Sequence, residues 1–270
     1  VGREMNNRYP VRDNCPVGDV VLEVKNWNAY HPEIPEMQIL KNINIKVRAG
    51  EVVGLAGLMG AGRTEFAMSL FGHSYGQKIS GEVYMHGKKV STKTVKDAIN
   101  NKIAYTSEDR KTYGLVLIDD IKTNMTMAAL RNYYSNGAIV NERKENLEAE
   151  EYKKKINVKA TSIHQTVGSL SGGNQQKVVL AKWMMTQPDV LILDEPTAVL
   201  TPQETEELFE QLKLLREKGH TIIFISHKLN EVKALCNRMT ILRDGKTMGT
   251  YEISDLDEQE ISRLMVGRDV

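Results

Sequence analysis

The amino-acid sequence predicts an α/β protein whose parallel core sheet carries an antiparallel β region and an inserted helical region. Three apolar runs support the core sheet: the runs at 51–56, 190–193 and 221–225. The last two contain no charged residue, which is typical of strands that are buried on both faces. The first leads into the glycine-rich stretch GLMGAGRT at 57–64, and a helical pattern follows at 65–71. Strand, glycine-rich turn and helix in this order predict a phosphate-binding loop.

The other elements follow from local patterns. Alternating apolar residues predict strands, whereas a 3.6-residue period and capping residues predict helices. The helix expected at 202–218 is well marked, because Thr201 is an N-cap residue, Pro202 occupies its first turn and Glu204 completes a capping box. Strands are expected at 20–27, 43–47 and 103–106, hairpins at 81–90 and 239–251, and further helices at 95–101, 123–155, 171–186 and 256–266.

The chain is expected to contain one domain and a linker. Residues 1–18 are polar and contain Pro10 and Pro16, which is typical of a linker. Residues 19–270 form the expected domain, and its helical subdomain is placed at about 115–187. A chain of 270 residues is long enough for this arrangement.

Composition narrows the classes of function. The hydrophobic share of 41% and the charged share of 26% are ordinary for a soluble globular protein. The net charge of +1 supplies no attraction to nucleic acid, so no nucleic-acid partner is expected. Cys15 and Cys236 are far apart, which disfavours a disulfide framework or a zinc site and favours a cytoplasmic setting. No run approaches the ~18 apolar residues of a membrane span, so work at a membrane would need another chain.

The glycine-rich stretch departs from the phosphate-loop pattern G-x-x-x-x-G-K-[ST] at one position. Gly57, Gly62 and Thr64 match, whereas Arg63 stands where the pattern has lysine. The glycines let backbone N–H groups turn toward phosphate oxygens, and the Thr64 hydroxyl is the expected Mg²⁺ ligand. A plain glycine-rich turn is the alternative interpretation of this stretch alone.

Two further stretches indicate phosphate chemistry. Asp194 follows the apolar run at 190–193, and an acid at the carboxyl end of a buried strand is well placed to hold Mg²⁺ beside a phosphate loop. Glu195 can then act on an attacking water. Capping of the next helix is the alternative role for these carboxylates, but Thr201 already caps that helix. LSGGNQQ at 170–176 places a serine and two glycines at a helix start, which favours a second phosphate-facing end.

Together these motifs resemble the nucleotide-binding domain of ABC transporters. They follow the order of that family: GLMGAGRT, then Glu108 at the Q-loop position, LSGGNQQK, LILDEPTA and finally His227. The resemblance covers about 20–270, and LSGGNQQK with LILDEPTA is highly specific. It implies a P-loop NTPase fold of the ABC type and an ATPase that uses ATP and Mg²⁺.

The resemblance also implies roles for individual residues. Glu195 is the implied general base, and His227 is the implied switch residue at the γ-phosphate. Glu108 stands where the family usually has glutamine, and it joins Thr64 and Asp194 as an implied Mg²⁺ ligand. Tyr30 or, less favoured, Trp27 is the implied contact on adenine, and Ser171, Gly172 and Gly173 are the implied contacts on a nucleotide bound to a different subunit. The other implied ATP contacts are Gly57, Leu58, Met59, Gly60, Ala61, Gly62, Arg63, Thr64 and Glu108.

The same resemblance implies partners and a location. In that family two such domains clamp two ATP molecules head to tail, and their closure moves a membrane permease. The implied partners are therefore a second nucleotide-binding domain, in a homo- or heterodimer, a permease and, indirectly, a substrate-binding protein. The implied location is the cytoplasmic face of the cell membrane, as a peripheral protein.

The subfamily resemblance changes along the chain. GLMGAGRTE, SEDRKTYGL and LSGGNQQKVVLAKW resemble the second, degenerate half of tandem ATPases for monosaccharide uptake, of the ribose, xylose and galactose type, which has arginine in its loop. From about residue 198 onward, AVLTPQETEELFEQL and LRDGKTMGT resemble the first half of such proteins, including a nucleoside branch. A rearranged or engineered sequence and an unusual natural branch both fit this pattern.

The leading hypothesis is an ATP-binding and hydrolysing subunit, or half-subunit, of a monosaccharide importer. Turnover at its own loop is expected to be weak, because the planar fork of Arg63 replaces the compact charge of lysine. The alternatives are a nucleoside importer ATPase, a nucleotide-binding regulatory module without significant hydrolysis, and a family member that acts on DNA or ribosomes. Arg63 favours the regulatory module, Glu195 and His227 oppose it, and the near-neutral charge disfavours the last alternative.

Overall fold

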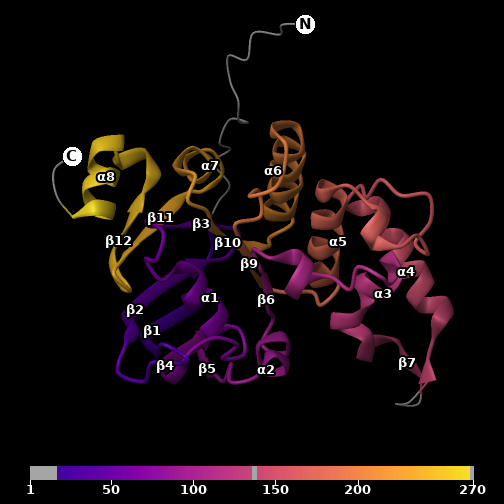
Figure 1. Cartoon of the computed structure of the whole chain (residues 1–270), viewed down its shortest axis with the longest axis horizontal. Coiled ribbons are helices and arrows are strands. Elements are labelled where there is room, and N and C mark those ends of the chain that lie inside the picture. The colour runs from indigo at the N-terminus through magenta and orange to yellow at the C-terminus, as the bar shows by residue number, and fades with distance from the viewer. Residues whose placement is uncertain (1–16, 136–138, 268–270) are drawn as a thin grey trace, which may run out of the picture.

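The computed structural model describes residues 17–135 and 139–267, so most of the expected linker at 1–18 lies outside the described residues. Two large β-sheets and a helical region make up the described fold (Figure 1). The helical region extends to one side of the sheets, and the C-terminal hairpin and helix lie on the opposite side (Figure 1). This is the expected combination of a core sheet, an antiparallel β region and a helical insert.

The core sheet has six strands in the order β12-β11-β3-β10-β9-β6. Five of them run parallel, and β12 pairs antiparallel with β11 at one edge. The predicted C-terminal hairpin is therefore part of the core sheet. The strands are β3 Val52–Ala56, β6 Ile103–Thr106, β9 Val190–Asp194, β10 Thr221–Ile225, β11 Arg238–Arg243 and β12 Lys246–Glu252.

The unbroken apolar character of the central strands has a direct structural cause. Along β9, Val190 and Ile192 pack into the apolar core that the sheet shares with the antiparallel strands. Leu191 and Leu193 point the other way, into the core that the sheet shares with the helical region. Successive residues of a strand face opposite sides, so a strand covered on both faces needs apolar residues at every position.

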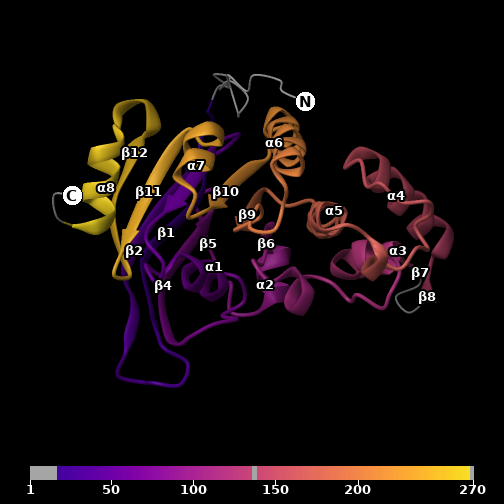
Figure 2. The ribbon, with the colours of Figure 1, turned by 45° about the horizontal axis from the view of Figure 1, so that its top comes forward.

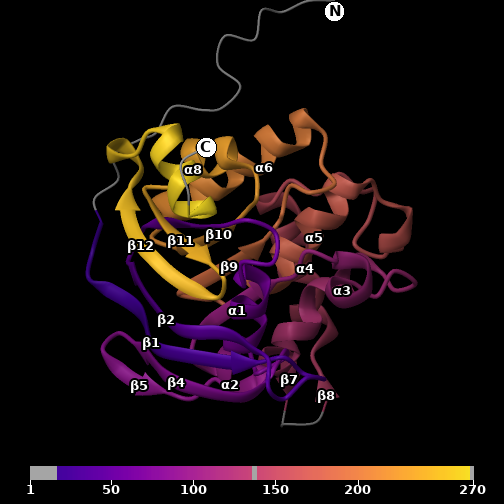
Figure 3. The ribbon, with the colours of Figure 1, turned by 60° about the vertical axis from the view of Figure 1, so that its left-hand side comes forward.

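The second sheet is antiparallel, in the order β2-β1-β4-β5, and it lies against the core sheet (Figure 3). Its first two strands are longer than predicted, because cross-strand pairing continues to Tyr30 and Gln38 through several irregular registers. The predicted hairpin at 81–90 is present at the end of this sheet. The strands are β1 Val20–Tyr30, β2 Gln38–Arg48, β4 Gln77–Met85 and β5 Lys88–Val90.

Helices cover the core sheet. The predicted capping box of α6 is confirmed, since the Thr201 side chain accepts from the Glu204 N–H and the Glu204 carboxylate accepts from the Thr201 N–H. The helices outside the helical insert are α1 Arg63–Leu70, α2 Val95–Asn100, α6 Pro202–Glu217, α7 Leu229–Leu235 and α8 Glu258–Val266.

The helical region is less continuous than predicted. The stretch at 123–155 was expected to be helical throughout, and this is wrong because a short hairpin interrupts it. The region lies beside the core sheet at the β6 edge, with α4 farthest out (Figure 2). Within the described residues no helix is both long enough and apolar enough to cross a membrane. The elements of this region are α3 Ile121–Thr126, a 3₁₀ turn Met127–Tyr133, β7 Tyr134–Ser135, β8 Ile139–Val140, α4 Glu142–Lys155, a 3₁₀ turn Val167–Ser169 and α5 Gly172–Met184.

Two hairpin turns allow a matched test of the packing between the sheets. Gly87 and Gly245 have similar backbone angles, with φ of 76° and 72°. A Cβ at Gly87 would meet nothing within 4 Å, whereas a Cβ at Gly245 would lie 1.9 Å from the Ile39 carbonyl oxygen. We expect Gly87→Ala to lower the free energy of unfolding by about 1 kcal/mol through backbone strain alone. Gly245→Ala should cost about 3 kcal/mol more, because backbone atoms must move. Urea denaturation measures both, and equal losses would contradict this account.

Candidate active site

The stretch at 57–64 forms a tight turn between β3 and α1. Gly60 and Gly62 have φ of 78° and 97°, and Gly62 is the N-cap residue of α1. A Cβ at Gly57 would lie 2.6 Å from the Leu242 carbonyl oxygen, so a close backbone approach requires glycine there. The tip of the turn reaches the surface, where Met59 is 96% exposed. The glycine pattern thus has a backbone explanation before any ligand is considered.

A buried carboxylate lies beside the first turn of α1. The Thr64 hydroxyl donates to Asp194 Oδ1 at 3.2 Å, and the Tyr105 hydroxyl donates to Asp194 Oδ2 at 2.9 Å. Burial raises the pKa of Asp194 to about 6, although both hydrogen bonds lower it. Burial and the Asp194 charge raise the pKa of Tyr105, which keeps its hydroxyl protonated as a donor. Two strand ends and one helix start therefore converge on this carboxylate.

The neighbouring carboxylate, Glu195, binds two side chains. Arg63 Nη1 donates to Glu195 Oε1 at 3.3 Å, and His227 Nδ1 lies 2.8 Å from Glu195 Oε2. Glu195 has a left-handed backbone with φ of 44°, and its N–H donates to the Ile225 carbonyl of the adjacent strand. The alternative role of capping the next helix does not apply to Glu195, because Thr201 caps α6.

Arg63 has a protein partner rather than an open position in the loop. Its side chain is buried, and it forms an ion pair with Glu195, which is also buried. The family resemblance implies that Arg63 contacts ATP, and no local pattern indicates Glu195 as its partner. The structure therefore joins the atypical loop residue directly to the implied general base.

Trp27 and Tyr30, the two candidates for stacking on adenine, occupy different environments. Trp27 is buried, donates its indole N–H to Ser69 Oγ at 2.9 Å and packs edge-on against His73. It is part of the apolar core and presents no free face. Tyr30 is half-buried at the end of β1, with Lys78 Nζ 5.3 Å from its ring centroid. Tyr30 stays the predicted adenine contact.

Glu108 lies near the carboxylates without a side-chain partner among the described residues. It is exposed, and its charge contributes to raising the pKa of Asp194. Its implied roles toward Mg²⁺ and ATP stay predictions.

The LSGG stretch forms the start of α5. Ser171 is the N-cap residue, and its hydroxyl accepts from the Asn174 N–H at 3.4 Å. The Gly173 N–H donates to Glu204 Oε1 at 3.1 Å. Within the described part of the chain, no hydrogen bond joins Ser171, Gly172 or Gly173 to the phosphate loop.

Comparison with known protein families decides where the chain belongs. The family model described as ABC transporter matches residues 40–198, which is more than half of the chain. The chain belongs to the ABC transporter family. The family resemblance expected from the motifs is confirmed.

Two curated relatives match nearly the whole chain. The L-arabinose transport ATP-binding protein of Geobacillus stearothermophilus is 45% identical over 265 residues, 98% of this chain and 51% of the relative. The xylose import ATP-binding protein of Thermoanaerobacter pseudethanolicus is 44% identical over 269 residues, 99% of this chain and 52% of the relative. The chain thus spans about half the length of the curated relatives it matches, as the resemblance to one half of a tandem protein implies.

A solved structure supports the fold at lower identity. The dimeric structure of a bacterial ABC transporter cassette has a TM-score of 0.70 and 23% sequence identity, and the match covers 86% of this chain and 98% of that one. The fold is that of an ABC ATPase cassette, as predicted.

The residues of this ABC cassette fit Mg²⁺. The Thr64 and Asp194 oxygens that lie 3.2 Å apart are hard ligands, and Mg²⁺ usually takes one or two protein oxygens together with phosphate oxygens and waters. Across 17–135 and 139–267, no group of three or more His, Cys, Asp or Glu side chains could hold a metal ion.

Tyr105 is a member of this site that the sequence motifs do not indicate. Its hydroxyl reaches Asp194 because β6 lies next to β9 in the core sheet. Its place near the carboxyl end of a parallel strand was the available signal, since side chains at that edge collect around one site.

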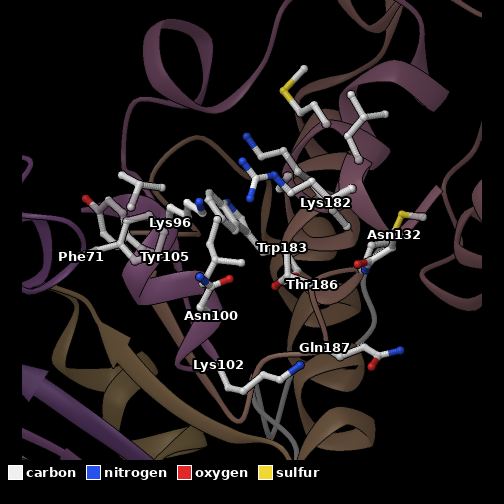
Figure 4. A pocket seen from close by; sticks show the side chains of 18 of the residues that line it. Phe71, Lys96, Asn100, Lys102, Tyr105, Asn132, Lys182, Trp183, Thr186 and Gln187 are labelled. Atoms are coloured by element: carbon white, nitrogen blue, oxygen red, sulfur yellow. Dashed lines mark hydrogen bonds between the residues drawn. The ribbon is translucent and has the colours of Figure 1, made fainter. Parts of the chain in front are cut away.

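A groove of about 1410 Å³ separates the core of the cassette from its helical region (Figure 4). Phe71 and Trp183 contact each other edge to face within it, with ring centroids 5.2 Å apart. Lys96 and Lys102 also line it. Lys182 is buried, donates to the Gly114 carbonyl at 2.5 Å and lies 5.0 Å from the Trp183 ring centroid.

Lys182 predicts a pH dependence of stability. Burial lowers its pKa from 10.5 to about 8. Between pH 8 and pH 10.5 the folded chain therefore binds fewer protons than the unfolded chain. The buried charge lowers the free energy of unfolding fully below about pH 8, and this loss disappears as the pH rises toward 10.5. Relative to Lys182→Met, the wild-type free energy of unfolding should rise by up to about 3 kcal/mol over this window.

The measurement is urea denaturation of both proteins from pH 7 to 10.5. Lys96→Met, which changes an exposed lysine on the same groove, should show no such window. A constant difference between wild type and Lys182→Met would contradict the prediction.

Proposed function

We propose that this chain is the ATP-binding and hydrolysing cassette of a monosaccharide importer, with weak turnover at its own phosphate loop. The observation that carries the proposal is the Arg63–Glu195 ion pair beside the Thr64–Asp194 hydrogen bond. It places the implied general base next to the implied Mg²⁺ ligands and ties that base to the atypical loop residue. Both Glu195 and Arg63 are buried, so little water screens their attraction.

The arrangement supports a division of roles among the side chains. Backbone N–H groups of the loop and the start of α1 bind phosphate oxygens. Thr64 and Asp194 would hold Mg²⁺, which when bound neutralises charge on the phosphates. Glu195 orients the attacking water and accepts its proton, and His227, on the other Glu195 oxygen, orients that carboxylate toward the γ-phosphate.

The ion pair is the proposed cause of weak turnover at this loop. Glu195 Oε1 accepts from Arg63 and Glu195 Oε2 lies against His227, so each carboxylate oxygen already has a partner. An attacking water then competes with Arg63 for a carboxylate that the ion pair holds in one orientation. Breaking a buried ion pair is costly, because an uncompensated charge stays behind. Lysine at position 63 would carry its charge on a compact, flexible ammonium, which can turn to phosphate instead of Glu195.

A second part of the proposal concerns the LSGG end. The start of α5 makes no hydrogen bond to the loop of the same chain within the described residues, which supports action on a nucleotide bound by a partner cassette. The chain then lends its Ser171 end to a partner whose loop carries lysine. Arabinose and xylose transport by the two relatives supports a pentose or related monosaccharide as the cargo.

The groove supports docking of a permease. Its aromatic floor and its lysines fit a short amphipathic helix with acidic residues, as a cytoplasmic loop of a permease could present. A permease and a substrate-binding protein would complete the importer, and the cassette would work at the cytoplasmic face of the membrane.

In the intact transporter, Lys96→Glu with Lys102→Glu should lower permease-stimulated hydrolysis at least about tenfold and spare basal hydrolysis. Equal loss of both would count against this docking site.

Arg63→Lys tests the proposal at the chain's own loop. We expect the variant to hydrolyse ATP at least about tenfold faster than wild type, because Glu195 is released toward water. Steady-state phosphate release under saturating ATP and Mg²⁺ measures the change. Arg143→Lys, an exposed arginine at the start of α4, serves as the matched control.

Adding Glu195→Gln to Arg63→Lys should abolish the gain. If Arg63→Lys binds ATP but hydrolyses it no faster than wild type, the restraint by Arg63 is refuted. If no variant hydrolyses ATP, the regulatory-module alternative gains support. A nucleoside cargo is tested separately, by asking which binding protein stimulates the intact transporter.

The hypothesis that the Ser171 end acts on a nucleotide bound by a partner cassette is tested by mixing two chains. We expect the wild-type chain to raise hydrolysis by a lysine-bearing cassette, and Ser171→Arg in the wild-type chain to remove most of that stimulation, because a bulky cation blocks the N-terminal end of α5. Phosphate release measured against the ratio of the two chains reports the effect. Stimulation that does not depend on Ser171 would rule the hypothesis out.

A further inference from the structure

Glu231 is a buried carboxylate that none of the roles described so far uses. It lies in the first turn of α7, shortly after His227, and it is only 3% exposed. A carboxylate is costly to bury unless hydrogen-bond donors surround it. The donors around Glu231 therefore indicate its role.

Three side chains bind the Glu231 carboxylate. The Thr197 hydroxyl donates to Oε2 at 2.6 Å, and the Ser226 hydroxyl donates to the same oxygen at 3.1 Å. Lys228 Nζ lies 3.1 Å from Oε1. Thr197 and Ser226 are both buried. Hydrogen bonds to a carboxylate are stronger than those between neutral groups, so this cluster is held firmly.

Lys228 closes the network. Its Nζ donates to the Thr197 carbonyl at 3.3 Å, and its backbone N–H donates to the Ser226 hydroxyl at 3.1 Å. The Ser226 hydroxyl thus accepts from Lys228 and donates to Glu231, which fixes the direction of its hydrogen. Each of the four residues therefore has at least two partners within the group.

The network joins the two chain segments that carry the Glu195–His227 contact. Thr197 belongs to the turn that begins at Glu195. Ser226 and Lys228 are the sequence neighbours of His227. The shared carboxylate thus ties the backbone that follows one member of the pair to the backbone on both sides of the other.

Both members of the pair need such support. Glu195 has φ of 44°, a left-handed conformation that costs free energy in a residue other than glycine and persists only where the surroundings hold it. The His227 side chain is 56% exposed, so packing does little to fix its ring. Their contact of 2.8 Å therefore depends on how accurately the two backbones are held.

We propose that Glu231 is a positioning residue for ATP hydrolysis. By tying Thr197 to Ser226, it keeps Glu195 and His227 within hydrogen-bond distance, and it acts through the two backbones rather than on the nucleotide. A displacement of about 1 Å can slow a reaction about 100-fold. The inference deepens the proposed function and rests on it, because the alignment of Glu195 matters only where ATP is hydrolysed.

A purely structural role for Glu231 is the competing explanation, and Glu51 provides the comparison. Glu51 is 1% exposed and accepts from Arg238 Nη2 at 2.9 Å. It lies just before β3, whereas the phosphate loop follows that strand. Both glutamates hold buried polar partners, but only Glu231 is attached to the segments of the site. If Glu231 merely stabilises the fold, the loss of either glutamate should spare catalysis by the folded molecules.

The sharpest variants are at Thr197, because valine keeps the volume and loses the hydroxyl, whereas serine keeps the hydroxyl. In a chain that carries Arg63→Lys, we expect Thr197→Val and Glu231→Ala to lower kcat at least about tenfold and to change KM for ATP less than about twofold. Thr197→Ser should retain most of the activity. Steady-state phosphate release measures both constants.

Glu51→Ala is the matched control. Urea denaturation gives its folded fraction, and kcat per folded molecule should stay within about twofold of the Arg63→Lys parent. An equal loss of kcat in Glu51→Ala and Glu231→Ala would contradict a positioning role.

The ¹⁵N signal of His227 Nδ1, recorded by NMR at one fixed pH, needs no hydrolysis. Glu195→Gln gives the position of this signal without the carboxylate. We expect Thr197→Val and Glu231→Ala to move the His227 signal toward that position and to leave the other histidine signals unchanged. Thr197→Ser and Glu51→Ala should leave it where it lies in wild type.

A shifted His227 signal together with a loss of kcat would support the proposal. An unchanged signal in Thr197→Val would overturn it whatever the rate, as would a Thr197→Ser variant that loses as much as Thr197→Val. If Glu231→Ala does not fold, Thr197→Val still decides, since Ser226 and Lys228 continue to bind the carboxylate. If the Arg63→Lys parent does not hydrolyse ATP, the proposed function fails, and the histidine signal still shows whether Glu231 positions the pair.

Discussion

The close approach of three backbone segments around the phosphate loop is the constraint on which the site depends. The Gly245 N–H donates to the Ala61 carbonyl, and the Lys41 N–H donates to the Gly245 carbonyl, so one hairpin turn joins the loop to the antiparallel sheet. A side chain on Gly57 or Gly245 would collide with a backbone oxygen. Because these positions admit no Cβ, the start of α1 is held in one place, and with it Arg63 and Thr64.

The glycine-rich loop and the start of α5 each bring an arginine and a glutamate close to glycines. At the loop, Arg63 pairs with Glu195. At the start of α5, Arg110 and Glu204 flank neighbouring glycines. Buried charges of this kind rarely add much stability, because desolvation offsets their attraction.

The segment after β6 connects the surroundings of Asp194 with the start of α5. The segment that carries Glu108 and Arg110 follows β6, whose Tyr105 hydroxyl donates to Asp194, and it continues to Gly114, where Lys182 of α5 donates to the carbonyl. One short segment therefore contacts the buried carboxylate, the LSGG helix and the groove.

Local sequence determined the strands of the core, the glycine-rich turn, the α6 capping box and the motif order, because each depends on neighbouring residues only. It also indicated Glu195 and His227, although not their contact. The hairpin within the helical region escaped prediction because its charged and polar surroundings resemble a solvated helix. Only the tertiary structure decided that Arg63 binds Glu195, that Tyr105 binds Asp194, and that Arg110 lies at Gly172. Arg63 and Glu195 are 132 positions apart in sequence, and Tyr105 and Asp194 are 89 positions apart. Arg110 and its hydrogen-bond partner Gln175 are 65 positions apart. The order of strands in the sheet brings them together, and no local pattern encodes that order.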